Sequence, residues 1–128
     1  MIEKCAAIIL CQRRLLVVRK RGASVFISPG GKISEGEAPI DCLRRELREE
    51  LCVELVDAEP FGTHERAAAD EDSMIRVHTW NVTVSGTCTP NSEIEELRWI
   101  RGGDTHAVGS VFAECVMPEL IRLGRLDA

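Results

Sequence analysis

One stretch of 23 residues, from Gly31 to Val53, constrains the fold of this chain more than any other segment. Its centre, Arg45–Glu50, consists almost entirely of good helix formers, which predicts an α-helix here. At helical spacing, four apolar side chains fall on one stripe: Ile40, Leu43, Leu47 and Leu51. Because proline suits a first helical turn, the helix is expected to begin near Ala38-Pro39 and to run to about Leu51.

A second face of the same helix is acidic. Glu46, Glu49 and Glu50 stand at positions i, i+3 and i+4, so their carboxylates are expected to crowd together. Each pair of like charges at this spacing destabilises an isolated helix by a few tenths of a kcal/mol. A hard divalent cation is the simplest way to offset that repulsion, since Mg²⁺ and Mn²⁺ prefer carboxylate oxygen.

The spacing of the fixed positions identifies a family. Gly31 is followed after five residues by Glu37 and after seven more by Arg45, which opens an Arg-Glu-Leu-x-Glu-Glu run. This closely resembles the signature of the Nudix hydrolases, G-x5-E-x7-R-E-U-x-E-E-x-G-U, in which U is a bulky apolar residue. Every fixed position matches except Cys52, which stands where the family has glycine. A solvated amphipathic helix would explain the charges, but not all the fixed positions in register.

The resemblance implies an α/β (α+β) protein with the Nudix fold, a mixed β-sheet sandwiched between α-helices. The 128 residues fit one Nudix hydrolase domain spanning residues 1–128. A formal net charge of −5 argues against binding to a nucleic-acid polymer or an anionic membrane, because both require basic patches. No apolar run approaches the length of a transmembrane helix, so no membrane association is expected.

The predicted order of elements is rich in β-strands. Two apolar runs separated by a short polar turn predict a hairpin, Cys5–Cys11 with Leu15–Arg19. Further strands are expected at Val53–Phe61, Ile75–Val84 and Glu95–Ile100, with a polar loop at Ala67–Ser73. A second helix is predicted at Ser110–Leu123, and Pro118 is expected to kink or interrupt it.

The family cuts a pyrophosphate bond in a nucleoside diphosphate linked to a group X, using water and a divalent metal ion. The resemblance implies Mg²⁺, with Mn²⁺ as a substitute, held by Glu49, Glu50 and the carbonyl of Gly31. Glu46 either ligates the metal or takes the proton from water, so Glu46 and Glu49 are the expected catalytic carboxylates. A metal in this position neutralises phosphate charge and lowers the pKa of bound water.

Two further assignments concern arginines. Glu37 and Arg45 are expected to form a structural ion pair that fixes the preceding loop on the helix. Arg19 resembles the residue with which some triphosphate-cleaving relatives contact substrate phosphate. The alternative for Arg19 is a solvated basic cluster with Lys20 and Arg21.

Some relatives draw another metal ligand from a later segment. Here an acidic run precedes the last predicted strand, and Glu96 is the favoured candidate, followed by Glu93 or Glu95. A solvated acidic turn is an equally good interpretation of this run.

The substrate is approached by subtraction. The chain has no tyrosine, which relatives acting on dinucleoside polyphosphates carry downstream, and no proline at the spacing typical of ADP-ribose hydrolases. A (d)NTP or damaged nucleotide, cleaved by water attack at phosphorus to NMP and pyrophosphate, is therefore favoured. ADP-ribose, a nucleotide sugar or a dinucleoside polyphosphate are the alternative substrates, and a non-catalytic nucleotide-binding module is the alternative function.

The six cysteines form no CxxC pair and show no zinc-ligand spacing. Most lie in apolar segments, which predicts reduced, buried thiols in a cytoplasmic protein. The family resemblance also allows a homodimer.

Overall fold

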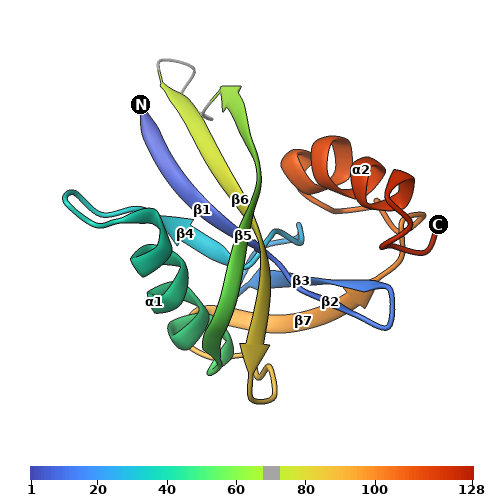
Figure 1. Cartoon of the computed structure of the whole chain (residues 1–128), viewed down its shortest axis with the longest axis horizontal. Helices are drawn as coiled ribbons and strands as arrows, with labels where there is room; N and C mark the ends of the chain where they lie inside the picture. The colour runs from blue at the N-terminus through green and yellow to red at the C-terminus, as the bar shows by residue number, and fades with distance from the viewer. Residues whose placement is uncertain (68–72) are drawn as a thin grey trace.

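The computed structural model describes residues 1–67 and 73–128, which form two sheets (Figure 1). In the first sheet the strand order is β4 (Gly30–Lys32), β1 (Ile2–Ile8), β6 (Met74–Ser85) and β5 (Glu54–Ala67). In the second sheet the order is β2 (Leu10–Cys11), β3 (Arg14–Lys20) and β7 (Ile94–Ile100). Strands β1 and β6 are parallel and the other pairs are antiparallel, so the first sheet is mixed.

Helical segments cover the sheets from two sides. Helix α1 (Pro39–Leu51) lies on one side, whereas η1 (Val111–Val116) and α2 (Met117–Arg122) lie on the other (Figure 1). Strand β3 is buried on both faces: Leu16 and Val18 pack in the cluster beneath α1. Leu15 and Val17, which alternate with them, pack in the cluster beneath η1 and α2. The α+β architecture, with a mixed sheet between helices, is therefore confirmed.

The predicted N-terminal hairpin is only partly correct. The run Cys5–Cys11 divides at Ile9: β1 pairs with β4 and β6, and only the two residues of β2 pair with β3. Ile8 packs in the cluster beneath η1 and α2, whereas Ile9 packs in the cluster beneath α1. An apolar run that is buried on both faces carries no local signal for the point at which it changes sheets.

Helix α1 has the bounds that the sequence predicts. It begins at Pro39, without a side-chain cap from Ala38, and ends at Leu51. Cys52 adopts the left-handed conformation, with φ 58° and ψ 35°. Its N–H donates to the carbonyl of Arg48, and the N–H of Val53 donates to the carbonyl of Leu47. The helix end is thus not reshaped by the loss of the family glycine, and the strained conformation is retained.

Strand β5 is longer than the predicted Val53–Phe61, because it continues through two register shifts as far as Ala67. Pro60 is tolerated within it since β5 is an edge strand, where a missing N–H need not break a ladder. Of the predicted loop Ala67–Ser73, residues 68–72 lie outside the described residues.

The predicted C-terminal helix is interrupted, as expected from Pro118. Its first part, η1, is a π-helix of six residues, and α2 then starts with Pro118 in its first turn. Among the helices of the described residues, none is long and apolar enough to span a membrane.

Candidate active site

Glu50 is the most deeply buried carboxylate in the part of the chain that the structure describes, with 1% of its surface exposed. Its Oε1 atom accepts a hydrogen bond of 2.8 Å from the N–H of Gly30, whereas Oε2 is buried without a hydrogen-bond partner. Burial raises the pKa of Glu50 to about 8, against the opposing effect of the Gly30 bond. The negative charges of Glu46 and Glu93 raise it further, while Lys20 lowers it.

Glu46 lies directly against Gly31, which together with Gly30 opens β4; these two residues are called the glycine turn below. A Cβ atom on Gly31 would stand 2.5 Å from Oε1 of Glu46, so only glycine leaves room for this carboxylate. Burial raises the pKa of Glu46, and the adjacent Arg45 guanidinium, whose Nη1 lies 3.0 Å from Oε1, opposes that rise. The loop and the helix are therefore fitted to each other at this contact.

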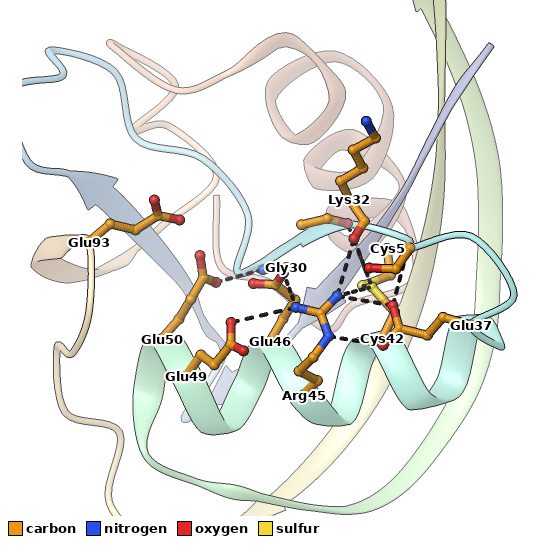
Figure 2. A network of polar contacts seen from close by, with 12 residues as sticks. Cys5, Gly30, Lys32, Glu37, Cys42, Arg45, Glu46, Glu49, Glu50 and Glu93 are labelled. Carbon is orange, nitrogen blue, oxygen red and sulfur yellow. Dashed lines mark hydrogen bonds and ion pairs between the residues drawn. The ribbon is translucent and has the colours of Figure 1, made fainter.

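Arg45 connects the loop to the acidic face of α1 (Figure 2). Its guanidinium donates to both oxygens of Glu37 at 2.9 and 3.0 Å and to the carbonyl of Lys32 at 3.2 Å. The hydrogen bonds from Arg45 lower the pKa of Glu37 to about 2. The same guanidinium lies 3.5 Å from Oε2 of Glu49. The structure thus places Glu37 and Arg45 in a two-bond ion pair that anchors the loop.

The three motif carboxylates do not converge on one point. Arg45 contacts both Glu46 and Glu49, and the Glu49 side chain is 53% exposed. Within residues 1–67 and 73–128, no group of three Asp, Glu, His or Cys side chains is arranged closely enough to hold a metal ion. The donor chemistry nevertheless fits a hard cation, because the unpartnered Oε2 of Glu50 is a buried carboxylate oxygen. Arg45 contacts Oε1 of Glu46 and Oε2 of Glu49, which leaves the second oxygen of each carboxylate outside that contact.

Arg19 and Glu96 contact each other, because they face one another across β3 and β7. Nε of Arg19 donates to Glu96 at 3.2 Å, and Nη1 donates to the carbonyl of Ala23 at 3.1 Å. Glu96 also accepts a bond of 3.0 Å from Arg98. Both predicted site residues are therefore occupied by protein contacts in this structure.

The later carboxylate that approaches the motif is Glu93. Its charge contributes to the raised pKa values of both Glu46 and Glu50, and Figure 2 shows it on the Glu50 side of the cluster. Nζ of Lys20 lies 3.3 Å from Oε1 of Glu93. Within this acidic run, the charge that acts on the motif helix is thus that of Glu93 and not that of Glu96, the candidate favoured from the sequence.

A cavity of about 280 Å³ adjoins the glycine turn and is lined in part by Gly30 and Gly31. It has three cationic lining residues, Lys4, Lys20 and Arg66, and an apolar wall that includes Ile75, Val77 and Phe112. Sequence reasoning missed Lys4 and Arg66. Arg66 reaches the cavity only because β5 continues past its predicted end and places Arg66 opposite Ile75, and no local pattern signals that register.

Comparisons with known proteins show the family of the chain. A family model described as NUDIX domain matches residues 1–112. The CTP pyrophosphohydrolase of Escherichia coli K12 is 34% identical over 86 residues, which cover 64% of this chain and 62% of that protein. This match therefore spans less than two thirds of the relative's length.

Two solved structures have a similar fold. The solution structure of the E. coli ORF135 protein has a TM-score of 0.82 and 27% identity, covering 97% of this chain and 91% of that chain. A MutT protein from Bacillus halodurans has a TM-score of 0.79 and 20% identity, covering 98% and 86% respectively, which shows the fold alone. As the Gly31–Val53 signature predicts, this chain belongs to the NUDIX domain family, the Nudix hydrolases.

Proposed function

We propose that this protein hydrolyses a pyrophosphate bond of a nucleoside triphosphate, releasing a nucleoside monophosphate and pyrophosphate. The proposal depends on one observation above all: the buried, unpartnered Oε2 of Glu50 stands beside a glycine turn that lines a cationic cavity. The relative described as a CTP pyrophosphohydrolase makes CTP the first substrate to test.

Mg²⁺ or Mn²⁺ would be held by Glu46, Glu49, Glu50 and the carbonyl of Gly31. When bound, such a cation neutralises charge on the diphosphate and lowers the pKa of water. The pKa of Glu50, raised to about 8, supports this assignment, because a carboxylate that is buried without a cation resists ionisation. Glu93 replaces Glu96 as the favoured additional ligand, since its charge acts on both Glu46 and Glu50.

The cavity next to the glycine turn would bind the nucleotide. Lys4, Lys20 and Arg66 would neutralise the oxygens of the phosphate chain, and Phe112 would offer an apolar surface to the base. Lys20 is better placed for this task than the neighbouring Arg19, because Lys20 lines the cavity and Arg19 does not. Arg19 is accordingly proposed to act through Glu96, by fixing the edge of β7.

The proton of the attacking water would pass to Glu46. Burial raises the pKa of this carboxylate, which makes it a stronger proton acceptor than a fully solvated glutamate. Arg45 holds its Oε1 atom at 3.0 Å and so fixes the orientation of the acceptor. The exposed Glu49 would serve as a ligand.

The test is magnesium-dependent release of pyrophosphate from CTP, followed by dNTPs, oxidised dGTP, ADP-ribose, nucleotide sugars and dinucleoside polyphosphates. Glu50→Gln is expected to reduce turnover by more than about 100-fold. Glu54→Gln is the matched control, because Glu54 is exposed and its ion-pair partner in the described residues is Arg48 alone. Equal activity in Glu50→Gln and in the control would refute the catalytic assignment.

A non-catalytic nucleotide-binding module is the second candidate, and one observation favours it. Arg45 contacts Oε1 of Glu46 and Oε2 of Glu49 at the same time, so a guanidinium of the chain already neutralises part of the acidic face. Nucleotides that raise the Tm of the protein, without any turnover across the whole panel, would select this alternative over the enzyme.

A further inference from the structure

Two buried cysteines meet beneath the glycine turn. Cys5 on β1 and Cys42 on α1 lie 37 residues apart in sequence, yet their Sγ atoms are 2.9 Å apart (Figure 2). Both side chains are buried, and both belong to the cluster beneath α1. Sulfur atoms at this separation need little movement to form a covalent bond.

The Cys42 thiol also contacts the loop that precedes the helix. Its Sγ lies 3.6 Å from the carbonyl oxygen of Lys32 and 3.8 Å from that of Gly31. Nη2 of Arg45 approaches the same sulfur at 3.7 Å. Cys42 is therefore part of the contact network that holds the loop on α1.

The thiol pair lies on the α1 side of β1, since both cysteines belong to the cluster beneath α1. The neighbouring Lys4 points to the opposite face of the strand, where it lines the cavity of about 280 Å³ together with Phe112. A small neutral oxidant would therefore reach the two sulfur atoms only when the protein opens locally.

We propose that Cys5 and Cys42 form an oxidisable dithiol, which hydrogen peroxide converts to an intrachain disulfide. The Cys5 sulfur attacks one peroxide oxygen, the O–O bond breaks, and the products are a sulfenic acid and water. The Cys42 sulfur then attacks the Cys5 sulfur, the S–O bond breaks, and hydroxide leaves as water with the Cys42 proton. In total the two thiols lose two electrons and two protons, and the peroxide is reduced to two waters.

The disulfide would fasten β1 to α1 around a loop that contains β2, β3 and β4. Closing a loop of 37 residues restricts the unfolded chain, and we expect Tm to rise on the order of 10 °C. Burial raises the pKa of both thiols, so the first step is expected to be slow at neutral pH.

The link is tested by mapping. The full chain carrying Cys11→Ser and Cys52→Ser, which removes the two exposed thiols, is treated with hydrogen peroxide, alkylated and digested with trypsin without reduction. Cys11→Ser also matters because Cys5 and Cys11 share the tryptic peptide 5–13. We expect peptide 5–13 joined to peptide 33–44, with the mass of both lowered by two hydrogens. Cys5 that stays reduced, or that is oxidised without joining Cys42, would overturn the proposal.

Two controls keep the result specific. Cys42→Ser retains a donor for the nearby carbonyls, and it should abolish both the linked peptide and the rise in Tm; Cys5→Ala should do the same. The rise should reverse with dithiothreitol. If the linked protein had an unchanged or lower Tm, the disulfide would distort β1 and α1. That result would contradict the proposal that the two thiols are positioned to form it.

Discussion

Helix α1 and the C-terminal segment η1–α2 cover opposite sides of the sheets, but they are built differently. Helix α1 is one regular helix of 13 residues, whereas the C-terminal segment is a π-helix of six residues followed by an α-helix of six. Helix α1 buries two carboxylates, Glu46 and Glu50, together with its leucines. The buried residues of η1 and α2 are all apolar: Phe112, Val116, Met117 and Leu120.

This difference indicates that α1, and not the C-terminal segment, bears a functional constraint. An unpaired buried carboxylate destabilises a fold, so its presence in α1 requires a reason outside packing. Among the described residues, the C-terminal segment buries no carboxylate. Its irregular shape follows from Pro118 and from packing against the sheet.

The largest loss of stability in a single variant is expected from leucine truncation. Leu47 in α1 and Leu120 in α2 are both fully buried, with 0% of each side chain exposed. Leu47→Ala should lower the free energy of unfolding by about 3–5 kcal/mol, because α1 is regular and cannot move to fill the space left by the deleted side chain. Leu120→Ala should cost about 2–3 kcal/mol, since the short α2 near the chain end can relax. Urea unfolding measures both, and equal losses would show that the two segments are equally rigid.

An effect of similar size is a dependence of stability on pH that comes from Glu50. Its pKa is about 8 in the folded protein, against an ordinary value of 4.5. Between these values the folded state binds more protons than the unfolded state, so the free energy of unfolding falls as pH rises from 4.5 to 8. At about 1.4 kcal/mol per pH unit, the loss across this window should reach about 4–5 kcal/mol.

Two variants isolate this dependence. Glu50→Gln should remove most of the decline, leaving a smaller part from Glu46, whose pKa burial also raises, and it should be the more stable protein at pH values above 8. Glu119→Gln in α2 should leave the decline unchanged, because Arg122 lowers the pKa of Glu119 and moves its titration below this window. Mg²⁺ should restore stability at high pH in the parent protein but not in Glu50→Gln. A decline of the same size in Glu50→Gln would assign it to another group.

A smaller effect is expected where α1 meets its loop. In Gly31→Ala the added Cβ would stand 2.5 Å from Oε1 and 2.6 Å from Cδ of Glu46, so that carboxylate must move. We expect a loss of about 1–3 kcal/mol in stability and a fall in turnover of at least tenfold. Gly109, which precedes η1, is the matched position: its nearest neighbour would be 3.5 Å from an added Cβ. Gly109→Ala should therefore change both quantities less, as urea unfolding and pyrophosphate release would show.

The same contrast explains how far the sequence predicts the fold. The bounds of α1 are predicted well because its helix formers, Pro39 and its apolar stripe all act locally. The split of the first strand at Ile9 is not predicted, because it depends on which cluster each face contacts. The length of β5 is likewise missed, since its pairing with β6 through two register shifts is a tertiary property.

The candidate site is likewise predicted only in part from the sequence. The Glu37–Arg45 contact spans eight residues, and the motif spacing is enough to indicate it. The position of Glu93 beside Glu50, and of Arg19 against Glu96, depends on how β7 is set against β3. Arg66 reaches the cavity through the register of β5. Residues that are distant in sequence thus enter the site through strand pairing, which a single sequence does not specify.

The smallest predicted effect concerns the ends of the two helices. Cys52 follows α1 with φ 58°, and Gly124 follows α2 with φ 72°, so a cysteine and a glycine hold the same left-handed conformation. Cys52→Gly should raise the free energy of unfolding by about 0.5–1 kcal/mol, because relief of the backbone strain exceeds the added freedom of the unfolded chain. Gly124→Ala should lower it by a similar amount, since an added Cβ would meet no atom within 4 Å and only backbone strain remains. Urea unfolding of both variants measures the two changes. If Cys52→Gly destabilises the protein, the contacts of the cysteine side chain stabilise the fold by more than the left-handed backbone strain costs. The end of α1 would then depend on the Cys52 side chain and not only on the backbone conformation.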